Sequence, residues 1–282
     1  MSDEGLFGPQ TVTWQLHADP TMWVAGICSL YLQALHPRAV AAVVQNSRFQ
    51  DDPLGRLMRT GNFVATTTYG TTTEAESAAE RVRRVHRKLR ATDRRTGTEI
   101  RLDEPDLLTW VHCAEVTSFA SVVRRAGFPL TDAQLNRYFD EQRRSAELVG
   151  LDPAEVPGST REMAEYFKQV RPELRRTADS DLVYRFLHRP FAPWWLLPVN
   201  VGYLPLGHLA YSALPGWARG LHGRAAYPAP VVAAGLRGFR ATGLAVPDQV
   251  RYRYPGDHVL RAVERLGKTA LPSIKALAHL QP

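Results

Sequence analysis

Apolar residues recur at intervals of three and four along most of the chain, which is the spacing of one face of an α-helix. Residues 22–46 are apolar almost throughout and predict one long helix, or two helices joined at Pro37. Proline lacks a backbone N–H and collides with the preceding turn, so it marks a kink or a new start. A further helix is predicted from Pro53 to residue 68.

The segment after residue 70 has the clearest amphipathic pattern. Thr73 and Glu76 fit a capping box, with Thr73 as the N-cap and Glu76 three positions later. Arginines take most of the outer positions of this segment. The inner stripe consists of Ala75, Ala79, Val82, His86 and Leu89. The pattern therefore predicts that the imidazole at position 86 points inward.

Capping residues, N-terminal prolines and apolar stripes predict six more helices, which begin near residues 105, 131, 159, 179, 230 and 255. Residues 190–230 are interrupted by proline, glycine and tryptophan and predict short helices and packed loops. No alternating run is long enough to predict a sheet. We expect an all-α protein, with one large helical domain over residues 21–282 and an N-terminal extension over residues 1–20.

The composition is that of an ordinary globular protein, because 44% of the 282 residues are hydrophobic and 22% are charged. A chain of this length can bury a large core. The two cysteines, Cys28 and Cys113, lie in separate apolar segments, which argues against a disulfide framework or a cysteine zinc site. No C-x-x-C-H motif is present, so the standard covalent attachment of haem is excluded.

The formal net charge of +7 fits either an anionic partner or a surface that is simply rich in arginine. We favour the second interpretation and predict no nucleic-acid partner, because the arginines are spread along the chain. The N-terminus is acidic, and no apolar run reaches the roughly 18 residues of a membrane-spanning helix. The sequence predicts a soluble, cytoplasmic protein without a transmembrane segment, and homo-oligomerisation stays open.

His86 is the sharpest candidate for chemistry. A neutral imidazole on an inner helical face can donate from one nitrogen and offer the other to a metal. A single protein ligand suits haem, since the macrocycle supplies four others. The alternative is a core histidine that bonds a backbone carbonyl.

Two other histidines lie in apolar segments. His112 and Glu115 are three residues apart on one helical face, which suits an acid–base pair, a pair that supports a metal ligand, or a plain hydrogen-bonded pair of the core. His36 precedes Pro37 and could bind the backbone carbonyls that the proline frees, or face a pocket.

Arg56, Arg59 and Thr60 share one side of a predicted helix by their spacing of three and four. Two guanidinium groups and a hydroxyl suit an anion, a propionate or a developing oxyanion. The alternative is a solvated arginine face. Motifs for phosphate-binding loops, serine hydrolases and zinc peptidases are absent.

These segments occur in an order that resembles one known family, the MpaB-type oxygenases and rubber oxygenases (latex-clearing proteins). The resemblance extends over residues 20–230. It rests on Leu35-His36-Pro37-Arg38-Ala39-Val40, Asn46-Ser47-Arg48-Phe49, Asp52-Pro53-Leu54-Gly55-Arg56-Leu57, Arg59-Thr60, Tyr69-Gly70, Val82-Arg83-Arg84-Val85-His86, Trp110-Val111-His112 and the segment from Tyr138 to Leu148.

The resemblance implies a helical fold, globin-like in its packing, around a non-covalent haem b that activates O2. It implies that His86 is the proximal iron ligand and that Arg56, Arg59 and Thr60 lie on the distal side. A further pocket hydroxyl falls on Thr117 or Ser118. His36 and His112 are expected as further cofactor-binding residues.

Two departures from the family pattern change what the resemblance implies. Arg59 stands where the rubber oxygenases have lysine, and a guanidinium cannot give a lone pair to iron. The sixth iron position is therefore expected to be open, bound by water, or bound by a side chain such as His36. No residue matches the distal-side glutamate of the rubber enzymes, so a general base is unassigned.

The function expected from the resemblance is a haem b-dependent oxygenase that uses O2 to oxidise an apolar small molecule, or to cleave its C=C bond. Trp194 and Trp195 could form a wall of the substrate site, or belong to the core. A haem carrier or gas sensor without turnover is the first alternative. A helical interaction protein without a cofactor is the second.

Overall fold

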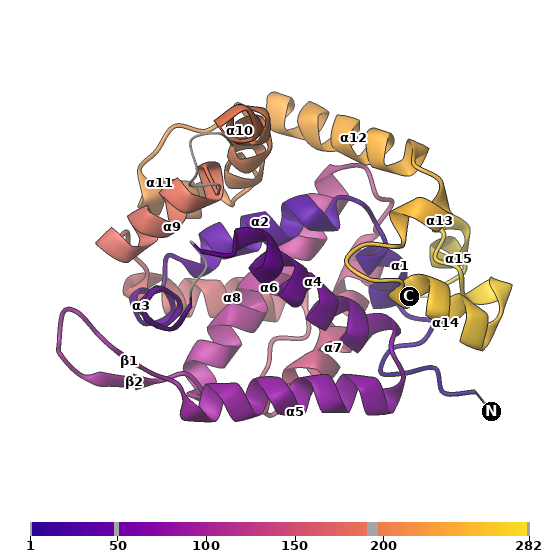
Figure 1. Ribbon diagram of the computed structural model, residues 1–282, viewed down its shortest axis with the longest axis horizontal. Coiled ribbons are helices and arrows are strands. Elements are labelled where there is room, and N and C mark those ends of the chain that lie inside the picture. Colours follow the sequence, from indigo (N-terminus) through magenta and orange to yellow (C-terminus); the bar gives the residue numbers. More distant parts are fainter. Residues whose placement is uncertain (1, 48–50, 191–196, 281–282) are drawn as a thin grey trace.

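The computed structural model describes residues 2–47, 51–190 and 197–280, and the protein belongs to the all-α class over these residues, as predicted, with most residues in helices (Figure 1). The α-helices are α1 (Val12–His17), α2 (Met22–Gln33), α3 (Pro37–Asn46), α4 (Pro53–Tyr69), α5 (Thr72–Lys88), α6 (Pro105–Arg125), α7 (Asp132–Leu148), α8 (Thr160–Val170), α9 (Ala178–His188), α10 (Leu197–Ser212), α11 (Gly216–His222), α12 (Ala229–Ala245), α13 (Asp248–Arg251), α14 (His258–Leu266) and α15 (Ile274–His279). Short 3-10 turns cover Arg171–Glu173 and Lys268–Ala270.

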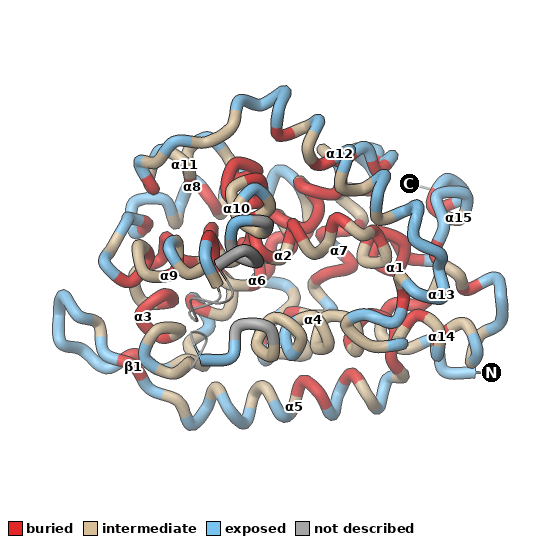
Figure 2. The backbone as a smooth tube through the Cα atoms, turned by 45° about the horizontal axis from the view of Figure 1, so that its top comes forward, coloured by how far each residue is buried: buried red, intermediate tan, exposed pale blue. Residues whose placement is uncertain are grey.

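The centre of the core lies where α2 runs along α6. Trp110 and Val122 of α6 and Tyr31 and Leu32 of α2 are completely buried. Both helices are apolar on most sides, which favours burial on most sides. Buried stretches concentrate in these central helices, whereas α5 at the edge is exposed over much of its length (Figure 2).

The apolar segment 22–46 forms two helices rather than one, because Pro37 starts α3 after a break. The axes of α2 and α3 differ by 110°. Among the described residues no single helix is long and apolar enough to cross a membrane, and α2 with α3 meets the length and composition criteria only as this bent pair.

α4 and α5 are consecutive helices that meet at a corner at Gly70 and pack against each other (Figure 1). The predicted capping box is wrong by two residues. Thr71 is the N-cap, its hydroxyl accepts from the Glu74 amide, and the Glu74 carboxylate accepts from the Thr71 amide. The register shifts because the chain leaves α4 at Gly70, so the first threonine after the corner takes the cap.

The predicted extension over residues 1–20 contains α1, which lies inside the fold. Val12, Trp14 and Leu16 are completely buried. The Trp14 indole N–H donates to the Ala270 carbonyl at 2.9 Å, and the Tyr69 hydroxyl donates to the Trp14 carbonyl at 2.9 Å. A boundary at residue 20 therefore does not separate α1 from the rest of the core.

Two other elements differ from the sequence prediction. Arg90–Thr92 and Glu99–Arg101 form a small antiparallel hairpin, β1–β2, closed by a turn with Gly97 at a φ of 73°. The stretch predicted as short helices and loops contains the 16-residue helix α10, which continues through Pro205. Packing against α2, α9 and α12 supports a helix that local propensity disfavours.

Candidate functional site

His86 occupies the last turn of α5, on the face that carries Ala75 and Ala79, which are buried. The imidazole is partly buried and makes no hydrogen bond within the described part of the chain. Burial lowers the pKa of His86, and the nearby Asp103 carboxylate opposes that shift. A neutral imidazole with no protein partner has a lone pair free for a ligand.

The three residues expected on the distal side are neighbours on α4 that differ in their exposure to solvent. Arg56 is partly buried and donates to the Ser47 hydroxyl, and burial followed by the charge of Arg59 lowers the pKa of its guanidinium. Arg59 is 69% exposed and pairs with Asp52 at 3.0 Å. The exposed Thr60 hydroxyl donates to the Arg56 carbonyl at 3.1 Å. Of the three, Arg56 alone is partly buried, because α4 turns the other two side chains toward solvent.

His36 is a structural residue at the start of α3. Its Nδ1 accepts from the Ala39 amide at 3.4 Å, so it caps freed N–H groups rather than the carbonyls that we expected. Its Nε2 lies 3.6 Å from a carboxylate oxygen of Glu173, and its ring lies 5.8 Å from that of Trp110. With both nitrogens facing protein groups, His36 is not available as a cofactor ligand in this arrangement.

α6 carries two ionisable groups that share a face but do not bond each other. His112 is buried, its Nε2 has no partner in the described chain, and burial lowers its pKa to about 4. Glu115 is partly buried, has no hydrogen bond or ion pair among the described residues, and burial raises its pKa to about 7. The predicted hydrogen-bonded pair is therefore absent, and each group keeps its own unfilled bonding capacity.

The two hydroxyls suggested by the resemblance are both buried on α6 without a hydrogen-bond partner in the described residues. Ser118 follows Glu115 by three positions and so lies on the same face, whereas Thr117 points to another side of α6. The Ser118 hydroxyl lies close to the Cys28 thiol but makes no hydrogen bond of normal geometry with it. Ser118 is thus the better match of the two by position.

A buried chain of polar groups next to α6 was missed by the sequence reasoning. The Thr68 hydroxyl donates to the Val64 carbonyl at 2.7 Å, so its oxygen must accept from His17 Nδ1 at 2.9 Å. His17 Nε2 then accepts from the Tyr138 hydroxyl at 3.1 Å. Burial lowers the pKa of His17 to about 3. Burial also raises the pKa of the Tyr138 phenol, and the nearby carboxylates of Glu115 and Glu141 raise it further.

The one sequence signal for these hydrogen-bonded groups is His17, a histidine in the apolar segment that begins at Val12. The helical domain was predicted to begin at residue 21, so it did not include His17. The four groups come from α1, α4, α6 and α7, so no spacing along the sequence links them.

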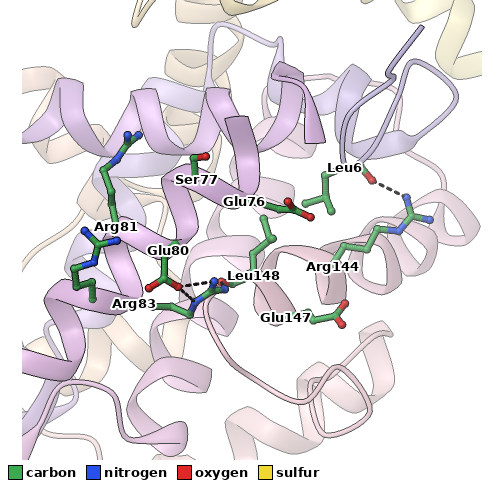
Figure 3. Close-up of a pocket in the computed structure, with 10 residues that line it drawn as sticks. Leu6, Glu76, Ser77, Glu80, Arg81, Arg83, Arg144, Glu147 and Leu148 are labelled. Atoms are coloured by element: carbon green, nitrogen blue, oxygen red, sulfur yellow. Dashed lines mark hydrogen bonds and ion pairs between the residues drawn. The ribbon is translucent and has the colours of Figure 1, made fainter. Parts of the chain in front are cut away.

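An open surface hollow of about 800 Å³ lies between α5 and α7, away from the inner face of α5 (Figure 3). Arg83 donates to Glu80 at 2.8 Å and to the Leu148 carbonyl, while Arg144 donates to the Leu6 carbonyl at 3.1 Å. The hollow contains neither His86 nor any other residue predicted for the site. Trp194 and Trp195 lie outside the described residues.

Comparison with protein families gives a match over residues 14–246, most of the chain. The matching family is described as "ER-bound oxygenase mpaB/B'/Rubber oxygenase, catalytic domain". The chain belongs to this family. Membership supports an enzyme of the oxygenase class, with O2 and a substrate as its partners. No curated protein and no solved structure matches the chain.

Proposed function

We propose that this MpaB/rubber-oxygenase family member binds haem b through His86 and uses O2 to oxidise an apolar small molecule or cleave its C=C bond. The observation that carries the proposal is the imidazole of His86. It lies on the inner face of α5, neutral and without a hydrogen-bond partner in the described chain, within a domain of an oxygenase family. A histidine with a purely structural role commonly bonds a carbonyl or a hydroxyl of the protein, and the partly buried ring of His86 bonds neither among the described residues.

The donor set fits a macrocyclic cofactor better than a bare metal ion. Within the described ranges, no three His, Cys, Asp or Glu side chains converge where they could hold a metal ion. Haem needs only one axial ligand from the protein, and its propionates need a cation. Arg56 is partly buried and forms no ion pair with any described residue, so its charge is available for a propionate.

The orphaned polar atoms on α6 support the same proposal. His112 Nε2, Thr117 Oγ1 and Ser118 Oγ are buried without partners in the described chain. Leaving such atoms unpaired costs on the order of 1–3 kcal/mol each, so a native protein normally supplies a partner from a ligand or water. A cofactor and substrate bound near α6 would supply one.

Bound haem would contribute the redox-active iron that activates O2. The chain's own residues would then have three tasks. His86 would hold the cofactor, Arg56 would bind an anionic group, and Glu115 would exchange a proton with the reacting groups. Glu115 suits that task because burial places the pKa of its carboxyl at about 7, where both protonation states are populated.

The test is haem binding by the purified full-length chain. We expect a Soret band and b-type haem near one equivalent per chain in a pyridine haemochrome assay. His86→Ala should weaken haem retention at least tenfold while the far-ultraviolet circular dichroism stays unchanged. His279→Ala is the matched control, because His279 is an exposed histidine in the last turn of another helix.

The outcomes separate the alternatives. Haem binding together with O2 consumption on an unsaturated apolar substrate supports the oxygenase. Haem binding without O2 consumption on any such substrate indicates a carrier or sensor. A colourless protein that takes up no added haem would overturn the proposal, and full retention by His86→Ala would move the ligand assignment to His112.

A further inference from the structure

A second group of histidines lies at the contact of α9 with α10, on the opposite side of the molecule from α5 (Figures 1 and 2). His188 ends α9 and is 7% exposed, whereas His208 of α10 is partly exposed. Nε2 of His188 lies 3.2 Å from Nδ1 of His208. The site proposed above uses neither residue.

The distance between the two nitrogens matches that of neighbouring ligands on a metal ion. Zinc binds imidazole nitrogen at about 2.0–2.1 Å, which places two nitrogens of a tetrahedral site about 3.3 Å apart and two nitrogens at a right angle about 2.9 Å apart. The observed 3.2 Å falls within this interval. Both lone pairs can therefore bind the same ion after small ring rotations.

The surroundings of His188 hold its ring in the orientation that a metal ligand needs. Nδ1 lies 3.0 Å from the Tyr184 carbonyl and 2.8 Å from the Tyr31 hydroxyl. A proton on Nδ1 that is donated to the carbonyl leaves the lone pair on Nε2, directed at His208. Histidines that bind metals are commonly fixed by a bond of this kind from the other ring nitrogen.

Close packing of the two helices brings His208 into position. A side chain at Gly207 would approach the Leu187 carbonyl to 2.7 Å and His188 Cα to 3.5 Å. The nearby cation Arg224 is compensated, because it pairs with Asp181 at 2.7 Å and lies 4.1 Å above the Tyr184 ring. Arg189, the other cation near His188, is exposed to solvent, which screens its charge. Burial lowers the pKa of both imidazoles, so they are neutral.

We propose that His188 and His208 bind one divalent transition-metal ion with a preference for imidazole, such as Zn²⁺ or Cu²⁺. The protein supplies two ligands, and water completes the coordination through the partly exposed side at His208. Such an ion ties α9 to α10, so binding adds to the stability of the folded chain. The proposal does not depend on haem.

The test uses the metal alone. The chelator-treated full-length chain is titrated with Cu²⁺ and with Zn²⁺, followed by electron paramagnetic resonance and calorimetry respectively. We expect about one ion per chain, pulsed resonance signals from two imidazole nitrogens, and a higher melting temperature with Zn²⁺. His208→Ala should weaken binding at least tenfold. His208→Gln keeps a hydrogen-bonding group beside His188 but should weaken metal binding as much as His208→Ala does.

Two controls keep this result separate from the haem site. His86→Ala should bind the metal as the natural chain does, whatever the outcome for haem. His279→Ala removes an exposed histidine and should also leave the affinity unchanged. Equal affinity in the natural chain and in His208→Gln, or no binding by either, would overturn the proposal and leave a hydrogen-bonded histidine pair.

Discussion

Two glutamates near Tyr138 show how differently this protein treats buried charge. Glu141 of α7 is 4% exposed, and its carboxylate accepts from the amides of Val12 at 3.0 Å and Thr13 at 2.8 Å, and from Arg137 at 2.9 Å. Glu115 of α6 is less buried but has no such partner among the described residues, and the pKa of its carboxyl rises to about 7. A buried carboxylate whose oxygens all accept hydrogen bonds has a structural role, whereas a buried carboxylate without hydrogen-bond partners is a candidate for a functional site.

The comparison extends to the regions around the two residues. Polar groups at the contact between α1 and α7 have hydrogen-bond partners. Glu141 caps α1, and the Gln142 side-chain amide donates to the Thr13 hydroxyl at 3.0 Å. α6 holds three buried polar atoms without partners in the described chain, namely His112 Nε2, Thr117 Oγ1 and Ser118 Oγ, on more than one of its sides. A contact whose polar groups are paired therefore lies beside a helix that carries several unpaired polar atoms.

The largest effect should come from breaking the satisfied contact. Glu141→Ala leaves the amides of Val12 and Thr13 without their acceptor, whereas Arg137 still donates to the Gln10 carbonyl. Each buried amide left unpaired typically costs about 1–3 kcal/mol. Urea denaturation should show that loss. Glu147→Ala, an exposed position on the same helix, should change the free energy of unfolding by less than about 0.5 kcal/mol. Similar values for both variants would contradict the structural role of Glu141.

Glu115 should produce a dependence of stability on pH. The pKa of its carboxyl is about 7 in the folded protein against 4.5 for the free group, so the folded state binds more protons between these values. Its contribution to stability is present below pH 4.5 and is lost as the pH rises to 7. The loss is at most roughly 3 kcal/mol, and less where water screens the group.

Glu115→Gln should remove this loss. The free energy of unfolding of the variant should therefore increase relative to that of the natural chain as the pH rises from 5 to 8. The difference between their unfolding curves isolates Glu115 from His17 and His112. The pKa values of those two imidazoles are lowered to about 3 and about 4, so their stabilisation disappears as the pH falls below 6.5. A difference that is independent of pH would show that Glu115 is not a buried, unpaired carboxyl.

A smaller effect is expected from Tyr138→Phe. The change removes the donor to His17 Nε2 and leaves a buried acceptor unpaired, which costs about 1–3 kcal/mol. Tyr254→Phe is the control, because Tyr254 is 67% exposed. Equal melting temperatures for both variants would show that the hydrogen bond to His17 contributes nothing.

The smallest effect should come from Arg59→Ala. Its pair with Asp52 is exposed on both sides, and such pairs contribute about 0–1 kcal/mol. If haem binds, its absorption spectrum should be the same in Arg59→Ala as in the natural chain. A shifted spectrum would place Arg59 at the cofactor and restore the distal role that the resemblance implied.

The sequence by itself predicted most of the helices, although not α1 or the full length of α10. Spacings of three and four, proline starts and threonine caps are local features, so they located α5 within two residues and predicted the inward direction of His86. The order of the segments along the chain also indicated the family, and the match over residues 14–246 confirms it.

Only the tertiary structure decided which polar groups have partners. Nothing in the sequence distinguishes Glu141, which caps a helix more than 120 residues away, from Glu115, which bonds nothing in the described chain. The sequence also does not show that His36 caps α3, or that close packing at Gly207 brings His188 next to His208. The physical reason is that a hydrogen bond requires two groups within about 3 Å, and helix packing sets that distance rather than sequence spacing.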